Sequence, residues 1–216
     1  MLKAVLFDFD GTIVDSLHLH LKVWRKTFAK YGKNLTDEEI IQNAFYATDK
    51  EISTAFDISD IEKLIELYWF YLDEVFEDLK LHENILDVFE WLRREKIKMA
   101  IVSFADSDYL KAHLKRLKIS EYFEFAFGPD NVNHPKPHPE IIEKALKGLY
   151  AKANETLLIG DSEMDIMTGK NAKVLTALYL PKTNLAYVEV NKLRALKPDF
   201  EFRNFSQLPR KLKRFL

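Results

Sequence analysis

The sequence predicts an α/β protein with a doubly wound, Rossmann-like parallel sheet and an inserted all-helical module. Three observations lead to this fold class. Short apolar runs alternate with helical patterns from residue 82 onward, which is typical of βαβ units. One more apolar run, Ala4–Phe7, stands near the N-terminus, and residues 15 to 81 between them have an almost wholly helical pattern. The predicted division is therefore an α/β core at 1–14 and 82–216, with a helical module at 15–81.

The helical module has readable start and stop signals. Apolar residues recur at helical spacing over Leu17–Tyr31, and Gly32 follows as a C-terminal cap. Thr36–Glu39 and Ser59–Glu62 have the capping-box pattern that opens a helix. The last helix is rich in aromatic residues, which we interpret as packing positions and not as a ligand site.

The remaining elements alternate in order along the chain. Helices are predicted at 83–95, 107–117, 139–149 and 163–171, and strands at 98–102, 123–127, 156–159 and 174–180.

Composition excludes several classes of function. The 216 residues carry a formal net charge of -2 and no basic stripe, which argues against nucleic-acid binding. There is no cysteine, so disulfides and thiol chemistry are excluded. No apolar stretch approaches the length of a membrane span, so we expect no membrane partner and a cytoplasmic location.

Two acids follow the first predicted strand. Asp8 and Asp10 in Asp8-Phe9-Asp10-Gly11-Thr12 are two apart, so an extended chain directs both side chains to one face. They stand at the carboxyl end of the strand, where open α/β sheets bind ligands. Two adjacent carboxylates repel each other unless a proton or a cation lies between them. An ordinary Asp-Gly turn is the alternative reading of this stretch.

Three further pieces follow later strands. Ser103 comes immediately after the strand at 98–102 and just before a helix, where a hydroxyl and free N–H groups suit a phosphate, although such a serine is also a common cap. Lys136 is held between Pro135 and Pro137, which indicates a positioned charge or, alternatively, an exposed loop lysine. Asp161 and Asp165 follow the strand at 156–159, where a simple helix cap is again the alternative.

Taken together, these residues predict a cation site beside a phosphate site. Ligands that are all oxygen favour a hard cation, and Mg²⁺ is the expected one. The six histidines show no metal-binding spacing and are interpreted as non-ligands. Neither a G-x-x-x-x-G-K-[ST] loop nor a G-x-G-x-x-G loop is present, so nucleotide binding through these motifs is not supported.

Asp8-Phe9-Asp10-Gly11-Thr12, Ser103, Lys136 and Gly160-Asp161-Ser162-x-x-Asp165 resemble, in order and spacing, the four motifs of the haloacid dehalogenase-like (HAD) superfamily. The resemblance covers essentially the whole chain, and the helical module is similar to that superfamily's α-helical cap. The nearest subgroup contains relatives of phosphoglycolate phosphatase and β-phosphoglucomutase. The chain departs from the pattern at Phe104-Ala105-Asp106 and at Phe45–Lys50, which lacks the glycine common in the cap's specificity loop.

The resemblance implies a Mg²⁺-dependent phosphatase that acts on a small phosphorylated metabolite through an aspartyl-phosphate. Asp8 would be the nucleophile and a metal ligand, and Asp10 the general acid and base, with its backbone carbonyl on the metal. Ser103 and Lys136 would hold the phosphate oxygens. Asp161 would be the second carboxylate ligand, supported by Asp165 directly or through water. The residues expected to bind substrate are Gly11, Thr12, Ser103, Phe104, Lys136, Tyr46 and Lys50.

Other functions remain open at this point. A phosphosugar mutase would use the same residues but return the phosphoryl group to a second hydroxyl. A haloacid dehalogenase fits the metal acids less well. A non-enzymatic, phosphorylatable switch also groups acids and a lysine at strand ends, but lacks a large helical insertion after strand one.

Overall fold

A parallel sheet with strand order β3-β2-β1-β4-β5-β6 forms the centre of the fold in the computed structural model, which describes residues 1–45, 47–213 and 215. Every pair of neighbouring strands is parallel. The strands are β1 (Ala4–Phe7), β2 (Lys98–Val102), β3 (Ala126–Phe127), β4 (Thr156–Gly160), β5 (Leu175–Tyr179) and β6 (Phe200–Phe202). The predicted α/β fold class, with a helical insertion after β1, is confirmed.

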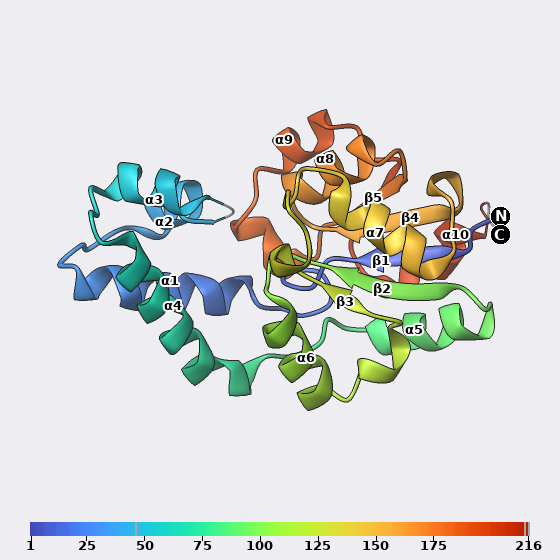
Figure 1. The fold of residues 1–216 in the computed structure, drawn as a ribbon, viewed down its shortest axis with the longest axis horizontal. Helices are drawn as coiled ribbons and strands as arrows, with labels where there is room; N and C mark the ends of the chain where they lie inside the picture. Colours follow the sequence, from blue (N-terminus) through green and yellow to red (C-terminus); the bar gives the residue numbers. More distant parts are fainter. Residues whose placement is uncertain (46, 214, 216) are drawn as a thin grey trace. The chain divides into compact units, whose positions relative to one another are not determined.

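The central strands β1 and β4 are buried along their whole length because helices cover both faces of the sheet. α5 (Ile85–Arg94) and α6 (Ser107–Arg116) lie on one side, and α7 (Glu140–Leu149), α8 (Glu163–Asn171) and α9 (Val190–Ala195) lie on the other (Figure 1). Leu6 packs on the α7 side in a cluster with Ile142. Phe7, the next residue, meets Phe89 of α5 edge to face at 5.4 Å, as the alternation of side chains along a strand requires.

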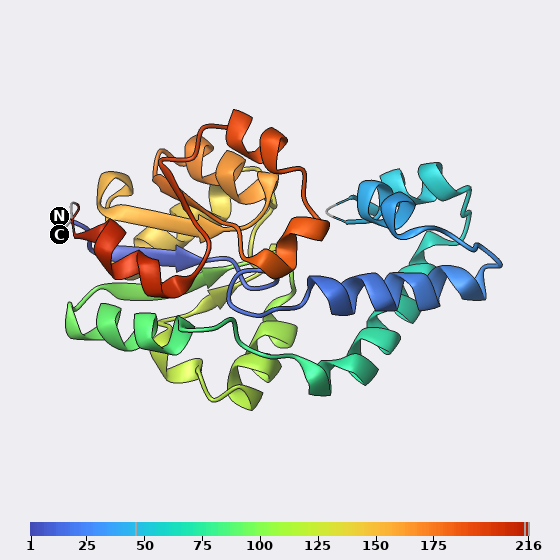
Figure 2. The same cartoon turned by 180° about the vertical axis from the view of Figure 1, so that it is seen from behind.

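The chain divides into two compact units. Unit 1 comprises Met1–Asp15 and Leu81–Leu216, and unit 2 comprises Ser16–Lys80. The beginning and end of unit 1 lie together at one end of the sheet, where the N–H of Leu2 donates to the carbonyl of Phe215 at 2.8 Å (Figure 2). α10 (Leu208–Leu212) packs there against α5.

Unit 2 is helical throughout its regular structure. It contains α1 (Leu17–Lys30), α2 (Asp37–Asn43), α3 (Asp49–Phe56) and α4 (Ile61–Val75), and α1 runs beside α4. Aromatic rings fill the space between these two helices: Trp24 and Tyr68 have centroids 4.2 Å apart, and both are buried. The interpretation of the aromatic run as packing is therefore correct for Tyr68. Phe70, in contrast, is 60% exposed.

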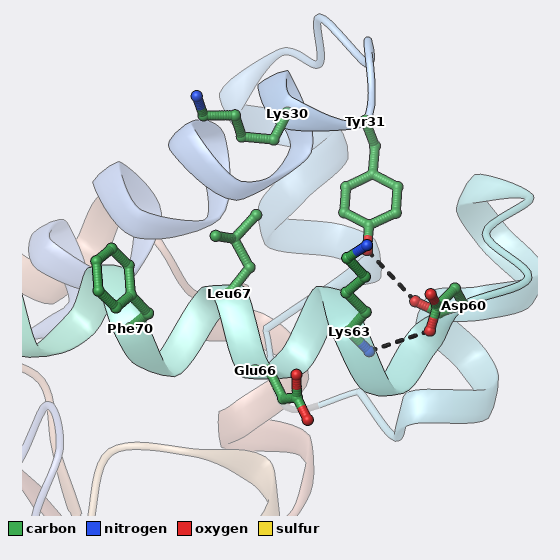
Figure 3. A pocket seen from close by; sticks show the side chains of 7 residues that line it. All are labelled: Lys30, Tyr31, Asp60, Lys63, Glu66, Leu67 and Phe70. Carbon is green, nitrogen blue, oxygen red and sulfur yellow. Dashed lines mark hydrogen bonds between the residues drawn. The ribbon is translucent and has the colours of Figure 1, made fainter.

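Phe70 lines a pocket of about 530 Å³ on the surface of unit 2 (Figure 3). Charged side chains of both signs line it, and the Asp60 carboxylate is hydrogen-bonded within unit 2. The Tyr31 hydroxyl donates to the carbonyl of Asp60 at 3.5 Å, and the N–H of Lys63 donates to the Asp60 carboxylate at 3.2 Å. The pocket therefore presents mixed charge and no converging set of catalytic groups.

The structure corrects several predicted boundaries. The strand predicted at 123–127 is confined to Ala126–Phe127, although Glu124 still donates its N–H to Met99. α4 is capped by Asp60 and not by Ser59, because the Asp60 carboxylate accepts the N–H of Lys63. α3, α9 and β6 had no sequence prediction of their own. Among the helices of the described residues, none is both long enough and apolar enough to cross a membrane.

Candidate active site

The predicted site residues converge at the carboxyl edge of β1 and β4. These two strands are neighbours in the sheet, and the chain order reverses between them, because β2 and β3 lie beyond β1 and β5 and β6 lie beyond β4. Such a reversal opens a crevice at the carboxyl ends of the strands. Asp8 follows β1 and Asp161 follows β4, and the N–H of Asp8 donates to the carbonyl of Ile159 at 2.9 Å.

Three carboxylates gather at this edge. Ligand oxygens of Asp8, Asp161 and Asp165 lie within 4.8 Å of one another, and all three residues are buried. Lys136 reaches into the same group from the loop before α7. Its ammonium lies 3.0 Å from Asp8 Oδ1 and 2.6 Å from Asp165 Oδ1. The side chain of Lys136 is only 1% exposed, so the reading of an ordinary exposed loop lysine is wrong.

Asp165 is fixed by the start of α8. Ser162 is the N-cap residue: its hydroxyl accepts the N–H of Asp165, and Asp165 Oδ2 accepts the N–H and the hydroxyl of Ser162. Both oxygens of Asp165 are therefore engaged, one by the helix cap and one by Lys136. Gly160 permits this approach, because a Cβ there would lie 2.2 Å from Cγ of Asp165.

Asp161 accepts hydrogen bonds from side chains of two other segments of the chain. The Thr12 hydroxyl donates to Asp161 Oδ1 at 2.9 Å, and the Asn184 amide donates to Asp161 Oδ2 at 2.9 Å. Gly11 lies against the same carboxylate with φ +73°, and a Cβ there would lie 2.3 Å from Asp161 Oδ2. Glycine is required at position 11 both for this backbone angle and for this contact.

Asn184 and His82 are two site residues that the sequence did not indicate. The same Asn184 amide also donates to the carbonyl of Gly11 at 2.8 Å, and His82 Nε2 lies 3.2 Å from that carbonyl. Because a carbonyl only accepts, His82 must carry its proton on Nε2. Burial lowers the pKa of His82, which favours this neutral form. Neither residue belongs to a local motif, so only the folded chain reveals them.

Asp10 and Ser103 lie nearby but outside the carboxylate triad. Asp10 is half-buried and accepts a hydrogen bond at 3.4 Å from the hydroxyl of Tyr109 on α6. Ser103 directly follows β2, is buried, and accepts the N–H of Ala105 at 3.1 Å. Phe104 is 39% exposed, and its ring centroid lies 5.7 Å from the Lys136 ammonium.

The electrostatics of this group favour a bound cation. Burial, together with the Asp165 charge, raises the pKa of Asp8 from its ordinary 3.8 to about 8 despite the nearby Lys136. Burial and the neighbouring carboxylates of Asp8 and Asp165 also raise the pKa of Asp161. Burial alone would lower the pKa of Lys136, but the carboxylates of Asp165 and Asp8 raise it above its ordinary value. Within the described part of the chain, the Lys136 ammonium contacts two of these three buried carboxylates, and the excess negative charge suits a divalent ion.

The donor set also fits a hard cation. The three described residues of the buried group each offer a carboxylate oxygen, and this is the ligand chemistry of Mg²⁺. The Asp161 oxygens accept hydrogen bonds from the neutral donors Thr12 and Asn184, which bring no positive charge to the group.

The candidate substrate residues of the helical module belong to unit 2. Tyr46 lies outside the described residues. Lys50 and Asp49 are in the first turn of α3 and not in a loop, and Thr48 is the N-cap of that helix. The Thr48 hydroxyl and the Glu51 carboxylate form a capping box, so the prediction of a specificity loop over 45–50 is wrong at its C-terminal end.

Comparison with known proteins decides the family. The sequence profile described as haloacid dehalogenase-like hydrolase matches residues 5–179. The chain is 30% identical over 209 residues to the pyrophosphatase PpaX of Bacillus mycoides, covering 96% of this chain and 95% of that protein. The chain belongs to the haloacid dehalogenase-like hydrolase family. It is therefore an enzyme of this family, as the resemblance of its four motifs implied.

Solved structures of other HAD-like proteins share the fold. A candidate phosphoglycolate phosphatase from Lactobacillus plantarum superimposes with a TM-score of 0.84 at 21% identity, covering 97% of this chain and 99% of that one. A candidate β-phosphoglucomutase from Thermotoga maritima gives a TM-score of 0.78 at 22% identity, with both chains fully covered. At these identities the likeness establishes the HAD-like fold and does not identify the substrate.

Proposed function

We propose that this HAD-like hydrolase is a Mg²⁺-dependent phosphatase that cleaves a small phosphomonoester through a phosphoryl group carried on Asp8. The observation that carries the proposal is the buried group of Asp8, Asp161 and Asp165 around the ammonium of Lys136. The proposal also assigns the two domains: residues 1–14 and 82–216 form the catalytic core, and residues 15–81 form the cap.

Asp8 and Asp161 would hold the ion, together with the backbone carbonyl of Asp10, and Asp165 would support them. When bound, Mg²⁺ supplies positive charge that offsets the repulsion between the phosphate and the attacking carboxylate. Lys136 also reduces the repulsion between the phosphate and the attacking carboxylate, because its ammonium lies 3.0 Å from Asp8. Lys136 and the Ser103 hydroxyl then bind the phosphate oxygens.

The chemistry divides into two displacements. In the first, a carboxylate oxygen of Asp8 forms a bond to phosphorus as the ester P–O bond breaks, and Asp10 gives its proton to the leaving oxygen. In the second, Asp10 takes a proton from water, the water oxygen bonds to phosphorus, and the Asp8–phosphorus bond breaks to release phosphate. Tyr109 keeps Asp10 in place through its hydroxyl.

Inorganic pyrophosphate is a second candidate substrate. The curated relative named pyrophosphatase is 30% identical over nearly the whole chain, and this likeness favours the candidate. A phosphoanhydride needs less help from a general acid than an alkyl ester, because its leaving group is less basic. The same residues would therefore serve both substrates.

Phosphate release from a panel of phosphorylated metabolites and from pyrophosphate, measured with Mg²⁺ and again after exhaustive chelation, tests the proposal. We expect chelation to abolish turnover and Asp8→Asn to do the same, because an amide is a poor nucleophile. Asp108→Asn, an exposed acid on α6, is the matched control and should retain activity. Full activity of the chelated enzyme or of Asp8→Asn would refute the mechanism.

The same panel separates the alternatives. Isomerisation of a sugar phosphate without phosphate release would identify a mutase. A stable phosphoryl group on Asp8 with no turnover of any substrate would identify a phosphorylatable switch.

A further inference from the structure

A second group of metal-binding side chains lies outside the carboxylate triad. His134, His138 and Glu140 offer ligand atoms that lie within 4.8 Å of one another. The two imidazoles are separated in sequence by Pro135-Lys136-Pro137, and this rigid stretch brings their ring centroids to 4.7 Å. The spacing along the chain carries no recognisable metal pattern. The fold of the loop brings these side chains together.

The carboxylate of this group is positioned by the backbone. Glu140 Oε1 accepts the N–H of Asn133 at 2.8 Å, and Glu140 Oε2 accepts the N–H of His134 at 3.0 Å. These bonds lower the pKa of Glu140, so it is ionised at neutral pH. Backbone donors that fix a ligand in this way are a regular feature around protein metal sites.

A ring nitrogen of each imidazole lies at hydrogen-bond distance from Glu140. His134 Nδ1 lies 2.8 Å from Glu140 Oε2, and His138 Nδ1 accepts the N–H of Glu140 in a long bond of 3.3 Å. Ligand atoms on one tetrahedral Zn²⁺ are about 3.3 Å apart, given metal–ligand bonds near 2.0–2.1 Å. Rotation of exposed side chains is enough to close the group around an ion. The backbone bonds to Glu140 can remain.

We propose that His134, His138 and Glu140 form a second metal site that takes a borderline transition-metal cation of the Zn²⁺ class. Two imidazoles and one carboxylate favour Zn²⁺, Ni²⁺ or Cu²⁺, whereas the all-oxygen triad favours Mg²⁺. The histidines interpreted from sequence as non-ligands thus include two ligands. The site has three protein ligands and leaves a coordination position for water.

The site has a structural consequence for the loop. Its histidines flank Lys136 at two residues on either side, and Glu140 is the first residue of α7. A bound ion therefore ties both ends of the Lys136 segment to the start of that helix. The inference does not depend on the proposed phosphatase activity, because none of its three ligands belongs to the carboxylate triad.

Zn²⁺ binding to the metal-free full chain, with any affinity tag removed and excess Mg²⁺ present, tests the proposal. Competition with a chromophoric chelator gives stoichiometry and affinity. We expect one Zn²⁺ per chain, and we expect His134→Ala and His138→Ala each to weaken binding about 10-fold or more, since even outer-sphere changes cost 10–100-fold. His18→Ala, an exposed histidine on α1, is the matched control and should bind as the wild type does.

Cu²⁺ provides a spectroscopic readout of the ligands. Its electron paramagnetic resonance spectrum should show hyperfine structure from two nitrogens in the wild type and from one in each alanine variant. Melting temperatures without metal establish that these surface variants are folded. Absence of Zn²⁺ binding, binding that is unchanged in either alanine variant, or complete displacement by Mg²⁺ would overturn the proposal.

Discussion

Lys136 is the single positive charge that the described structure places in contact with both Asp8 and Asp165. We predict that Lys136→Ala lowers kcat/KM on p-nitrophenyl phosphate by about 10²–10³-fold, the usual effect of removing one donor to developing charge. Lys50→Ala, in the first turn of α3, should change it by less than about twofold, since an activated ester needs little help from its leaving-group side. Steady-state kinetics at saturating Mg²⁺ measure both values, and equal losses would show that the phosphate site is misplaced.

Asn184 joins the loop after β1 to the acid after β4, because its amide bonds both the Gly11 carbonyl and the Asp161 carboxylate. We predict that Asn184→Leu, which keeps the approximate size but removes both donors, weakens Mg²⁺ or Mn²⁺ binding about 10–100-fold. Titration calorimetry without substrate measures this directly. Thr176→Val is the control, because it removes the hydroxyl of a β5 residue that donates a half-buried hydrogen bond to Asp199, away from the triad. Equal metal affinity in the wild type and Asn184→Leu would reduce Asn184 to a purely structural role.

A single site residue can be predicted from the sequence when it stands in a specific local motif. Asp8, Lys136 and Asp161 each stand directly after an apolar run or between prolines, so their placement follows from strand and loop geometry. Asn184 is 23 residues beyond Asp161, in the short helical turn Lys182–Ala186. Nothing local marks it, because its role depends on the distance between two chain segments that only the packed sheet defines.

A helix cap can affect both the stability of its helix and the geometry of the active site. Ser162 at α8 and Thr48 at α3 form the same kind of capping box, but only Ser162 is bonded to an acid that also holds Lys136. We predict that Ser162→Ala and Thr48→Ala each lower the free energy of unfolding by about 1 kcal/mol. Only Ser162→Ala should also lower kcat on p-nitrophenyl phosphate. Urea denaturation and kinetics on the same preparations test this, and a parallel loss of kcat in Thr48→Ala would contradict it.

The observed helices and strands show which elements can be predicted from the sequence. α8 begins and ends where its pattern indicates, at Glu163 and Asn171, because a capping box and a buried strand frame it. β6 has three residues at the edge of the sheet, and two of them are only half-buried, so its alternation is too short to distinguish from a loop. α3 was missed for another reason: its Thr48 capping box stands in a segment whose resemblance to a specificity loop favoured the wrong structure.

For the whole molecule, burying three carboxylates with one ammonium makes the stability of the metal-free protein depend on pH. The pKa of Asp8 rises from 3.8 to about 8 on folding, so above pH 4 the folded state binds more protons at Asp8 than the unfolded state does. Stability from this group is therefore present at low pH and lost as pH rises through about 8. Asp161 acts in the same direction because its pKa is also raised. His82 acts in the opposite direction near its ordinary pKa of 6.5, because burial lowers it.

Above pH 7 the pH dependence of stability reports on the carboxylates, because His82 is neutral there in the folded and unfolded states and Lys136 remains charged. We predict that the melting temperature with a chelator falls between about pH 7 and about pH 9, and that the slope is smaller in Asp8→Asn. Mg²⁺ replaces protons as the counter-charge of the triad, so its stabilising effect should be larger at the upper end of this window than at the lower end. Thermal unfolding with chelator and with Mg²⁺ at each pH measures both effects. A chelated protein whose stability is flat over this window would mean that the triad is not buried as a charged group, and the electrostatic case for the cation would fail with it.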